Sequence, residues 1–248
     1  MVQYNPLQFL PTQDELPETD HKPVDSQLQV LIASLLDDIL SWAWSNRTDW
    51  FWGINMGVYY QQHLPPIVPD GFLCLGVERL PRQGGRLSYV VWQEGSVPIL
   101  ALEYVSKTYG GEYDSKKDDY ANMGVTYYVV YNPEYSTRHN HSPFEVYRLV
   151  QGKYVLQSGE PFFMPEIGLG IGRAEGTYRG WSREWLYWYD SDGNRLPSPD
   201  ERAEMTQQEL QQQRQRAEIA QQQLEQERRL AEELIAKLRA RGIDPDTL

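Results

Sequence analysis

Cysteine and basic charge are scarce in this chain, and long apolar runs are absent. Cys74 is the one cysteine among 248 residues, so no internal disulfide can form and a reducing compartment is indicated. No apolar run approaches the roughly 20 residues that a membrane-spanning helix needs. Residues 1–6 have neither the basic start nor the apolar core of a signal peptide. We therefore expect a soluble, cytoplasmic protein with no membrane partner.

The shortage of basic residues also bears on partners. The formal net charge is −12, and most of it lies in residues 1–199. This counts against binding nucleic acid through a broad basic surface, although a local basic groove is not excluded. Aromatic residues, in contrast, are plentiful, with eight Trp and 17 Tyr. Such a composition predicts a folded domain with a substantial core.

Glycine, proline and aromatic residues are all missing from residues 201–241. We predict one long helix over 200–241 and a short tail at 242–248. Small and apolar residues recur every seven positions in one row, and a second row is mixed in character. Two such rows indicate a weak coiled-coil seam and hence a homodimer. A solvated single helix is the open alternative. The heptad row is Ala203, Leu210, Ala217, Leu224, Ala231 and Leu238.

Three regions precede this helix. Residues 1–25 are rich in proline and acids and predict an extended arm, and residues 26–199 form the folded domain. Apolar residues at three- and four-residue spacing predict a helix over about 25–45, and a second helix is expected over 114–123 and ends at Gly124. Short apolar and β-branched runs predict strands at 50–53, 72–77, 89–92, 99–105, 126–131, 144–149, 154–156 and 185–189. The glycines at 168–172 predict a loop. The class is α/β.

Two acids mark the candidate site. Asp70 follows Pro69 at the start of a strand, and Glu103 lies within an apolar strand. Mg²⁺ prefers oxygen ligands and usually takes one or two carboxylates, so both acids and the Tyr104 carbonyl are candidate ligands. A nearby ammonium group can stabilise charge on a phosphate or orient a water molecule. The pattern alone is weak, because an acid at a strand edge is more often a cap or a surface charge.

The order of these motifs resembles the Uma2 family of restriction-endonuclease-like proteins, which is abundant in cyanobacteria. The resemblance extends from Ser26–Gln29 to the Gln/Glu-rich helix and the Gly242–Pro245 ending, and no single motif is specific. The motifs that carry it are Pro69-Asp70, Glu103 with Ser106, Lys116 with Tyr120, Gly124-Val125 and Asn132-Pro133.

This resemblance implies the PD-(D/E)XK nuclease fold, a mixed sheet of four to five strands flanked by helices. It implies that Asp70 and Glu103 bind Mg²⁺, with Mn²⁺ as a substitute, and that the substrate is nucleic acid, DNA rather than RNA. Val105 stands where the parent pattern has lysine, so the catalytic lysine is expected on the next helix as Lys116. Lys117 is the fallback, and Lys107 is expected to point across the sheet edge. The function implied is a Mg²⁺-dependent endodeoxyribonuclease. The alternative is a catalytically silent nuclease fold that docks partners through its C-terminal helix.

Other patterns favour structural interpretations. His139 and His141 lie in a polar loop without a third ligand, which predicts a surface loop. Asp190, Asp192 and Asn194 match the first positions of a calcium loop, but Arg195 stands where glycine is required, so a turn is expected. The aromatic residues over 181–189 could stack nucleobases, but their alternation favours sheet packing.

Overall fold

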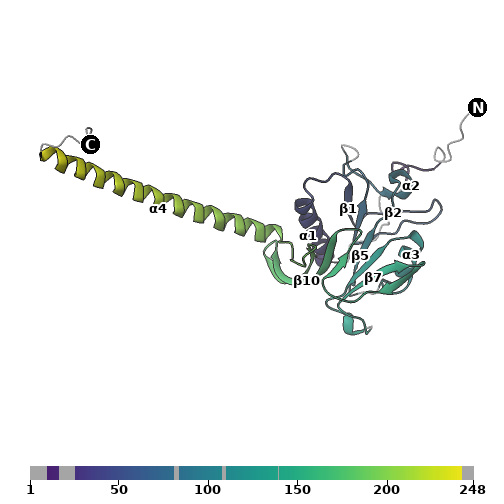
Figure 1. Ribbon diagram of the computed structural model, residues 1–248. Coiled ribbons are helices and arrows are strands. Elements are labelled where there is room, and N and C mark those ends of the chain that lie inside the picture. The colour runs from purple at the N-terminus through teal and green to yellow at the C-terminus, as the bar shows by residue number, and fades with distance from the viewer. Residues whose placement is uncertain (1–9, 17–25, 81–83, 108–109, 139, 242–248) are drawn as a thin grey trace, which may run out of the picture. The chain divides into compact units, whose positions relative to one another are not determined.

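The computed structural model describes residues 10–16, 26–80, 84–107, 110–138 and 140–241, except the side chain of Arg138. Most of the predicted arm, 1–9 and 17–25, and the tail 242–248 lie outside these residues. The chain divides into two compact units, Met1–Ser198 and Pro199–Leu248. The first unit contains three sheets and three α-helices among the described residues, and the second contains the long helix α4 (Figure 1).

Helix α1, Gln27–Ala43, begins where the sequence indicated. The Ser26 side chain caps it by accepting a hydrogen bond from the Gln29 N–H. One face of the helix is apolar and is buried against the sheets, as the three- and four-residue spacing predicted. The buried residues are Leu28, Leu31, Ile32, Ala33, Leu35, Leu36, Ile39 and Leu40.

A mixed six-stranded sheet forms the centre of the first unit. Its order is β1-β3-β5-β6-β7-β8, and β5 and β6 are parallel whereas the other neighbours are antiparallel. The family resemblance implied a mixed sheet of four to five strands, so the observed sheet is one or two strands larger. The strands are β1 (Trp50–Ile54), β3 (Gly71–Leu75), β5 (Leu100–Tyr104), β6 (Tyr127–Tyr131), β7 (Phe144–Val150) and β8 (Lys153–Leu156).

The remaining strands form two smaller sheets. One has the order β11-β10-β9, with β9 at Phe162–Met164, β10 at Leu169–Tyr178 and β11 at Trp181–Tyr189. The other pairs β2, Val58–Tyr59, in parallel with β4, Tyr89–Val90.

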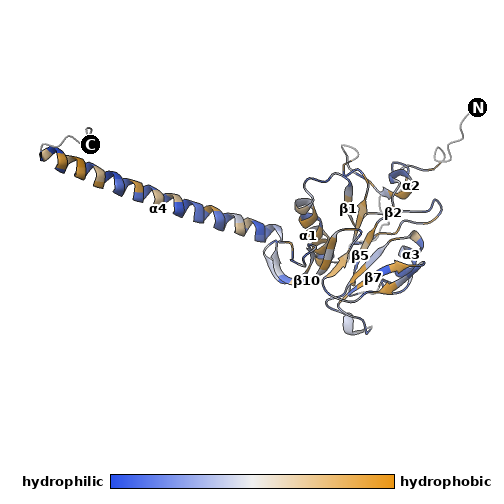
Figure 2. Ribbon diagram, viewed as in Figure 1, coloured by the Kyte–Doolittle hydropathy of each residue, from blue (hydrophilic) through white to orange (hydrophobic). Residues whose placement is uncertain are grey.

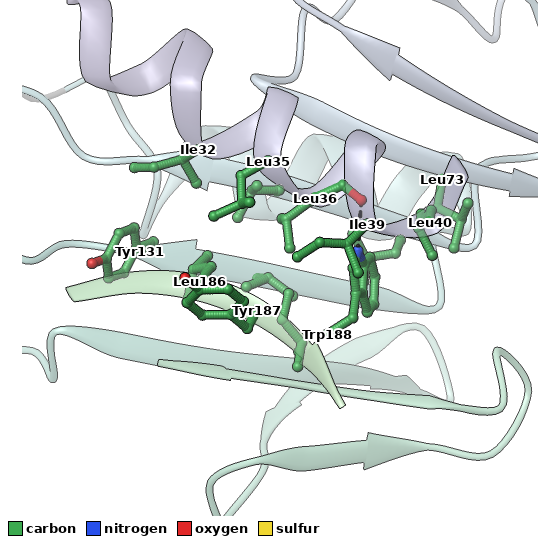
Figure 3. Packing of buried hydrophobic residues seen from close by; sticks show 14 of the residues in the cluster. Ile32, Leu35, Leu36, Ile39, Leu40, Leu73, Tyr131, Leu186, Tyr187 and Trp188 are labelled. Carbon is green, nitrogen blue, oxygen red and sulfur yellow. Dashed lines mark hydrogen bonds between the residues drawn. The ribbon is translucent and has the colours of Figure 1, made fainter. Parts of the chain in front are cut away.

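Successive side chains of the central strands point to opposite faces of the sheet, which divides the core into two layers. Leu73, Leu102 and Val129 face a layer that contains α1 and the three-stranded sheet. Figure 3 shows this layer, where the Trp188 Nε1–H donates to the Leu36 carbonyl oxygen at 3.0 Å. Burial of Trp185, Tyr187 and Trp188 confirms sheet packing for these aromatic residues.

The second layer is the one that carries the candidate site. Phe72, Ala101 and Val130 face it, together with two residues of α3, Ser115–Met123. The residues from α3 are Tyr120 and Met123. The helix ends at Gly124, whose φ of 90° is left-handed, as predicted.

Two predicted elements are wrong. The strand expected at 89–92 is only Tyr89–Val90, because the chain turns into the short helix α2, Val91–Glu94. The loop expected at 168–172 is mostly strand, because Leu169–Gly172 begins β10. Glycine suits position 172 of this strand, because the Cβ of any other residue would lie only 3.0 Å from the Pro161 backbone.

Helix α4 extends over Pro199–Ala240 and buries no residue within its own unit. Most of it is polar, and apolar residues gather toward its C-terminal end (Figure 2). Exposed apolar side chains of the predicted heptad rows include Leu210, Leu224 and Leu234. Helices in the described part of the chain are all too short or too polar to span a membrane.

Candidate active site

Asp70 lies directly before β3, and contacts from two other segments fix its side chain. Its Oδ2 accepts a hydrogen bond from the Tyr104 N–H at 2.5 Å, and its Oδ1 accepts one from Gln29 Nε2 of α1. Gly71 allows this arrangement, because a Cβ there would lie 2.7 Å from Trp52 Cζ2. Asp70 is 4% exposed, so its orientation is set by protein groups rather than by water.

Glu103 lies in β5 on the sheet face that α3 covers. Its Oε1 accepts a hydrogen bond from the Tyr120 hydroxyl at 2.5 Å, and its Oε2 lies 2.8 Å from Lys116 Nζ. The side chain is fully buried. Strand alternation explains its position, because Ala101 and Val105, two residues away on either side, also face α3. Asp70 interacts electrostatically with both Glu103 and Lys116, so the two carboxylates lie near each other and near the start of α3.

Burial and mutual repulsion disfavour the charged forms of these acids. Desolvation raises the pKa of Asp70 to about 6, against the lowering effect of its hydrogen bonds from Tyr104 and Gln29. Desolvation, and then the charge of Asp70, raise the pKa of Glu103 to about 8. Desolvation is the largest single effect on Lys116 and lowers its pKa. The charge of Glu103, its hydrogen bond with Lys116 and the charges of Asp70 and Glu112 together outweigh it, so the net direction is upward. Lys116 therefore remains a cation beside two carboxylates whose charges are costly.

The structure separates the three candidate lysines. Lys116 contacts Glu103, as described above. Lys117 lies one helical position further on, with its Nζ 3.7 Å from the centre of the Tyr147 ring. Lys107 is exposed on the loop after β5. Only Lys116 of these three lies against the acid pair, and its catalytic role remains a prediction.

Sequence reasoning missed several groups around the pair. Gln29 interrupts the apolar pattern of α1, and this polar position was the available sign that the residue belongs to the site. Glu112 is 4% exposed and lies 3.9 Å from Lys116 Nζ, but no motif in the sequence singled it out. Tyr120 belonged to the recognised motif, although its contact with Glu103 was not foreseen.

A pocket opens beside this site. It has a volume of 430 Å³ and lies between two segments, residues 60–68 and the start of α3. Lys116 is part of its lining. The segment 60–68 leads into Asp70 two residues later, so the pocket and the acid pair are neighbours.

The donor set suits a hard divalent cation. Two buried carboxylates repel each other, and a bound cation would relieve this repulsion. The Tyr104 carbonyl stays a candidate ligand beside them. In the parts of the chain that the structure describes, no group of three or more His, Cys, Asp or Glu side chains could hold a metal ion.

The other motifs are structural. His141 Nδ1 lies 3.1 Å from Glu145 Oε1, and its ring stacks on Tyr113 with the centroids 3.6 Å apart; His139 lies outside the described residues. Asp190 accepts hydrogen bonds from the backbone and side chain of Asn194, which confirms the expected turn.

The fold and the site define a class: an α/β protein with a mixed sheet and a buried pair of acids contacted by a lysine. Comparison with known families then assigns the chain. Residues 18–169 match the model of the Uma2 family, described as "Putative restriction endonuclease", and the chain belongs to this family.

Two further comparisons were made. One solved structure is described as a "putative nuclease belonging to DUF820 from Anabaena variabilis ATCC 29413". It is 18% identical to this chain, with a TM-score of 0.41, over 62% of this chain and 88% of that one. A search of the curated proteins gave no match.

Proposed function

We propose that the protein is a Mg²⁺-dependent endonuclease that hydrolyses phosphodiester bonds in DNA. The observation that carries this proposal is the convergence of Asp70, Glu103 and Lys116 from three separate elements. Membership of a family described as "Putative restriction endonuclease" supports the same chemistry.

Asp70 and Glu103 would hold the cation. The hydrogen bonds from Gln29, Tyr104 and Tyr120 orient their carboxylates before any cation binds, which reduces the cost of assembling the site. The chemistry that a bound Mg²⁺ supplies in such sites is neutralisation of the phosphate charge and activation of a water molecule.

Lys116 would act on the phosphate or on the attacking water. Its ammonium group is held beside Glu103 and also lines the neighbouring pocket, so a phosphate placed between them would lie within its reach. A fixed positive charge in a partly dehydrated site stabilises the charge that develops in the transition state. Val105, the residue at the usual lysine position, is buried among apolar groups and cannot serve this purpose.

A second candidate is a catalytically silent module that assembles through α4. The exposed apolar residues of α4, among them Leu224 and Leu234, favour it. The negative net charge favours it as well, because it weakens general binding of nucleic acid.

Cleavage assays distinguish the two candidates. Wild-type protein with Mg²⁺ or Mn²⁺ should cleave DNA supplied in single-stranded or duplex form, and EDTA should abolish the activity. Asp70→Asn and Glu103→Gln should each lower the rate by at least about 100-fold. Asp118→Asn is the matched control, because Asp118 is an exposed acid on the same helix as Lys116. A folded wild type that cleaves neither DNA nor RNA with either metal would contradict the proposal.

A further inference from the structure

The pocket beside the acid pair has two unlike walls. Residues Leu64, Pro65, Pro66, Ile67 and Val68 form an apolar wall, with Tyr60 at its start. Lys116 and Asp119 of α3 contribute to the opposite, polar wall. The pocket can thus place a flat apolar group against the first wall and a charged group against the second.

The charges of the pocket are balanced rather than basic. One lysine and one aspartate line it, and the whole chain carries a net charge of −12. Binding of a duplex through many phosphate contacts requires a track of lysine and arginine, because its free energy comes mainly from counterion release. The pocket residues provide one such cation, so most of the affinity must come from another source.

Burial of a nucleobase is the source that the apolar wall can supply. Base stacking on aromatic and apolar side chains is independent of net charge. The Tyr60 ring is half-buried and packs at the edge of the second core layer, which would hold it in place for stacking. The volume of 430 Å³ falls at the lower end of the range of small-ligand sites and suits one nucleoside.

We propose that this pocket seats one unpaired nucleobase next to the phosphate that is cleaved, so the substrate class is single-stranded nucleic acid. The inference rests on the nuclease function proposed above for its choice of ligand. A base within a duplex would have to leave its stack before it could enter the pocket, which costs a few kcal/mol. Asp119, an acceptor, would favour a base that presents an amino or imino hydrogen at the polar wall.

Binding without metal tests this proposal separately from catalysis. A 12-nucleotide DNA with one 2-aminopurine, as a single strand and as a duplex, would be titrated with the full-length protein in EDTA. The single strand should bind at least about 10-fold more tightly than the duplex, with quenching of the 2-aminopurine. The logarithm of its affinity should fall with log[salt] with a slope of about −0.7, as expected for one phosphate contact of a single strand.

Tyr60 variants show whether the pocket is responsible. Tyr60→Ala should weaken binding of the single strand about 5- to 100-fold, and Tyr60→Trp should restore it. Phe163→Ala is the control, because Phe163 is an aromatic residue of β9 that is 40% exposed and does not line the pocket. It should bind like wild type.

The outcomes separate this inference from the nuclease proposal. Equal or tighter binding of the duplex would overturn the proposed role of the pocket, even if wild type cleaves DNA. A Tyr60→Ala protein that binds the single strand like wild type would overturn it as well. The expected binding pattern in a protein that cleaves nothing would support the pocket and count against the nuclease proposal alone.

Discussion

Lys116 Nζ lies 2.8 Å from Glu103 Oε2, so a cation from α3 contacts an acid from β5. Thirteen positions of sequence separate the two residues. The contact places the ammonium group where Val105, directly after β5, cannot place one, and it distinguishes Lys116 from its neighbour Lys117. The lysine of this site therefore comes from the helix and not from the strand.

The first prediction concerns this lysine. Lys116→Met should lower the single-turnover cleavage rate by at least about 100-fold, because a preorganised positive charge is lost. Mn²⁺ affinity, measured by calorimetry, should be unchanged or higher, because a competing cation has left the acid pair. Lys117→Met serves as the control and should change the rate by no more than a few-fold. A similar loss in both variants would refute the assignment.

The second prediction concerns Gln29, which donates to Asp70. Gln29→Ala should weaken Mn²⁺ binding about 10-fold, because the carboxylate loses a group that orients it. Gln27→Ala is a matched control, since Gln27 is an exposed glutamine on the same helix. Calorimetry measures the Mn²⁺ affinity of both variants and of wild type. A Gln29→Ala protein that binds Mn²⁺ as tightly as wild type would show that Gln29 has no role in positioning Asp70.

The third prediction concerns pH and Asp37 of α1. Desolvation, and then the charge of Asp38, raise the pKa of Asp37 from 3.8 to about 6. Between these values the unfolded chain releases the proton and the folded chain keeps it, so the free energy of unfolding falls as the pH rises. Asp37→Asn removes this cost. It should be about 1–2 kcal/mol more stable than wild type at neutral pH, allowing for partial solvent screening, and equally stable near pH 4.

Urea unfolding at the two pH values measures this difference. The control is Asp49→Asn, because hydrogen bonds from Arg47 lower the pKa of Asp49 and the substitution should not stabilise the fold. A stability gain of Asp37→Asn that is the same at both pH values would contradict the electrostatic explanation.

The fourth prediction concerns α4. We propose that its heptad rows pair two copies of the chain, as the sequence suggested. Leu224→Glu should then convert a dimer to a monomer in light scattering, because it places charge in the seam. Ile219→Glu is the control: Ile219 is equally exposed, 55% against 56%, but lies outside both rows. A wild type that is monomeric at all concentrations would exclude the coiled coil.

Periodicity was the reliable guide to the fold. The apolar face of α1 follows from its three- and four-residue spacing, and β5 and β6 follow from short apolar and β-branched runs, so the sequence predicted all three elements. The switch from strand to helix at Val91 could not be predicted this way, because residues 89–92 are all suited to a strand. The glycines at 168–172 misled the prediction, since Gly170 and Gly172 lie within β10, where Gly172 packs closely against Pro161.

The residues of the site also fall into those that the sequence indicated and those that only the structure reveals. Asp70 and Glu103 were candidates from their places in the sequence, the family resemblance selected Lys116, and the structure brings the three together. Gln29 joins them through a tertiary contact with Asp70, 41 residues further along the chain, which no local pattern encodes. Glu112 lies only four residues before Lys116, but it belongs to no motif that marks it as part of the site. The pocket formed by residues 60–68 was missed for the same reason.

Anomalous diffraction from crystals soaked in Mn²⁺ tests the central claim most directly. The proposed nuclease site predicts one strong peak within about 2.0–2.3 Å of carboxylate oxygens of both Asp70 and Glu103. The same soak of Asp70→Asn crystals should show a much weaker peak or none. Wild-type crystals with no peak between these two acids, at Mn²⁺ concentrations that support catalysis by metal-dependent nucleases, would contradict the account.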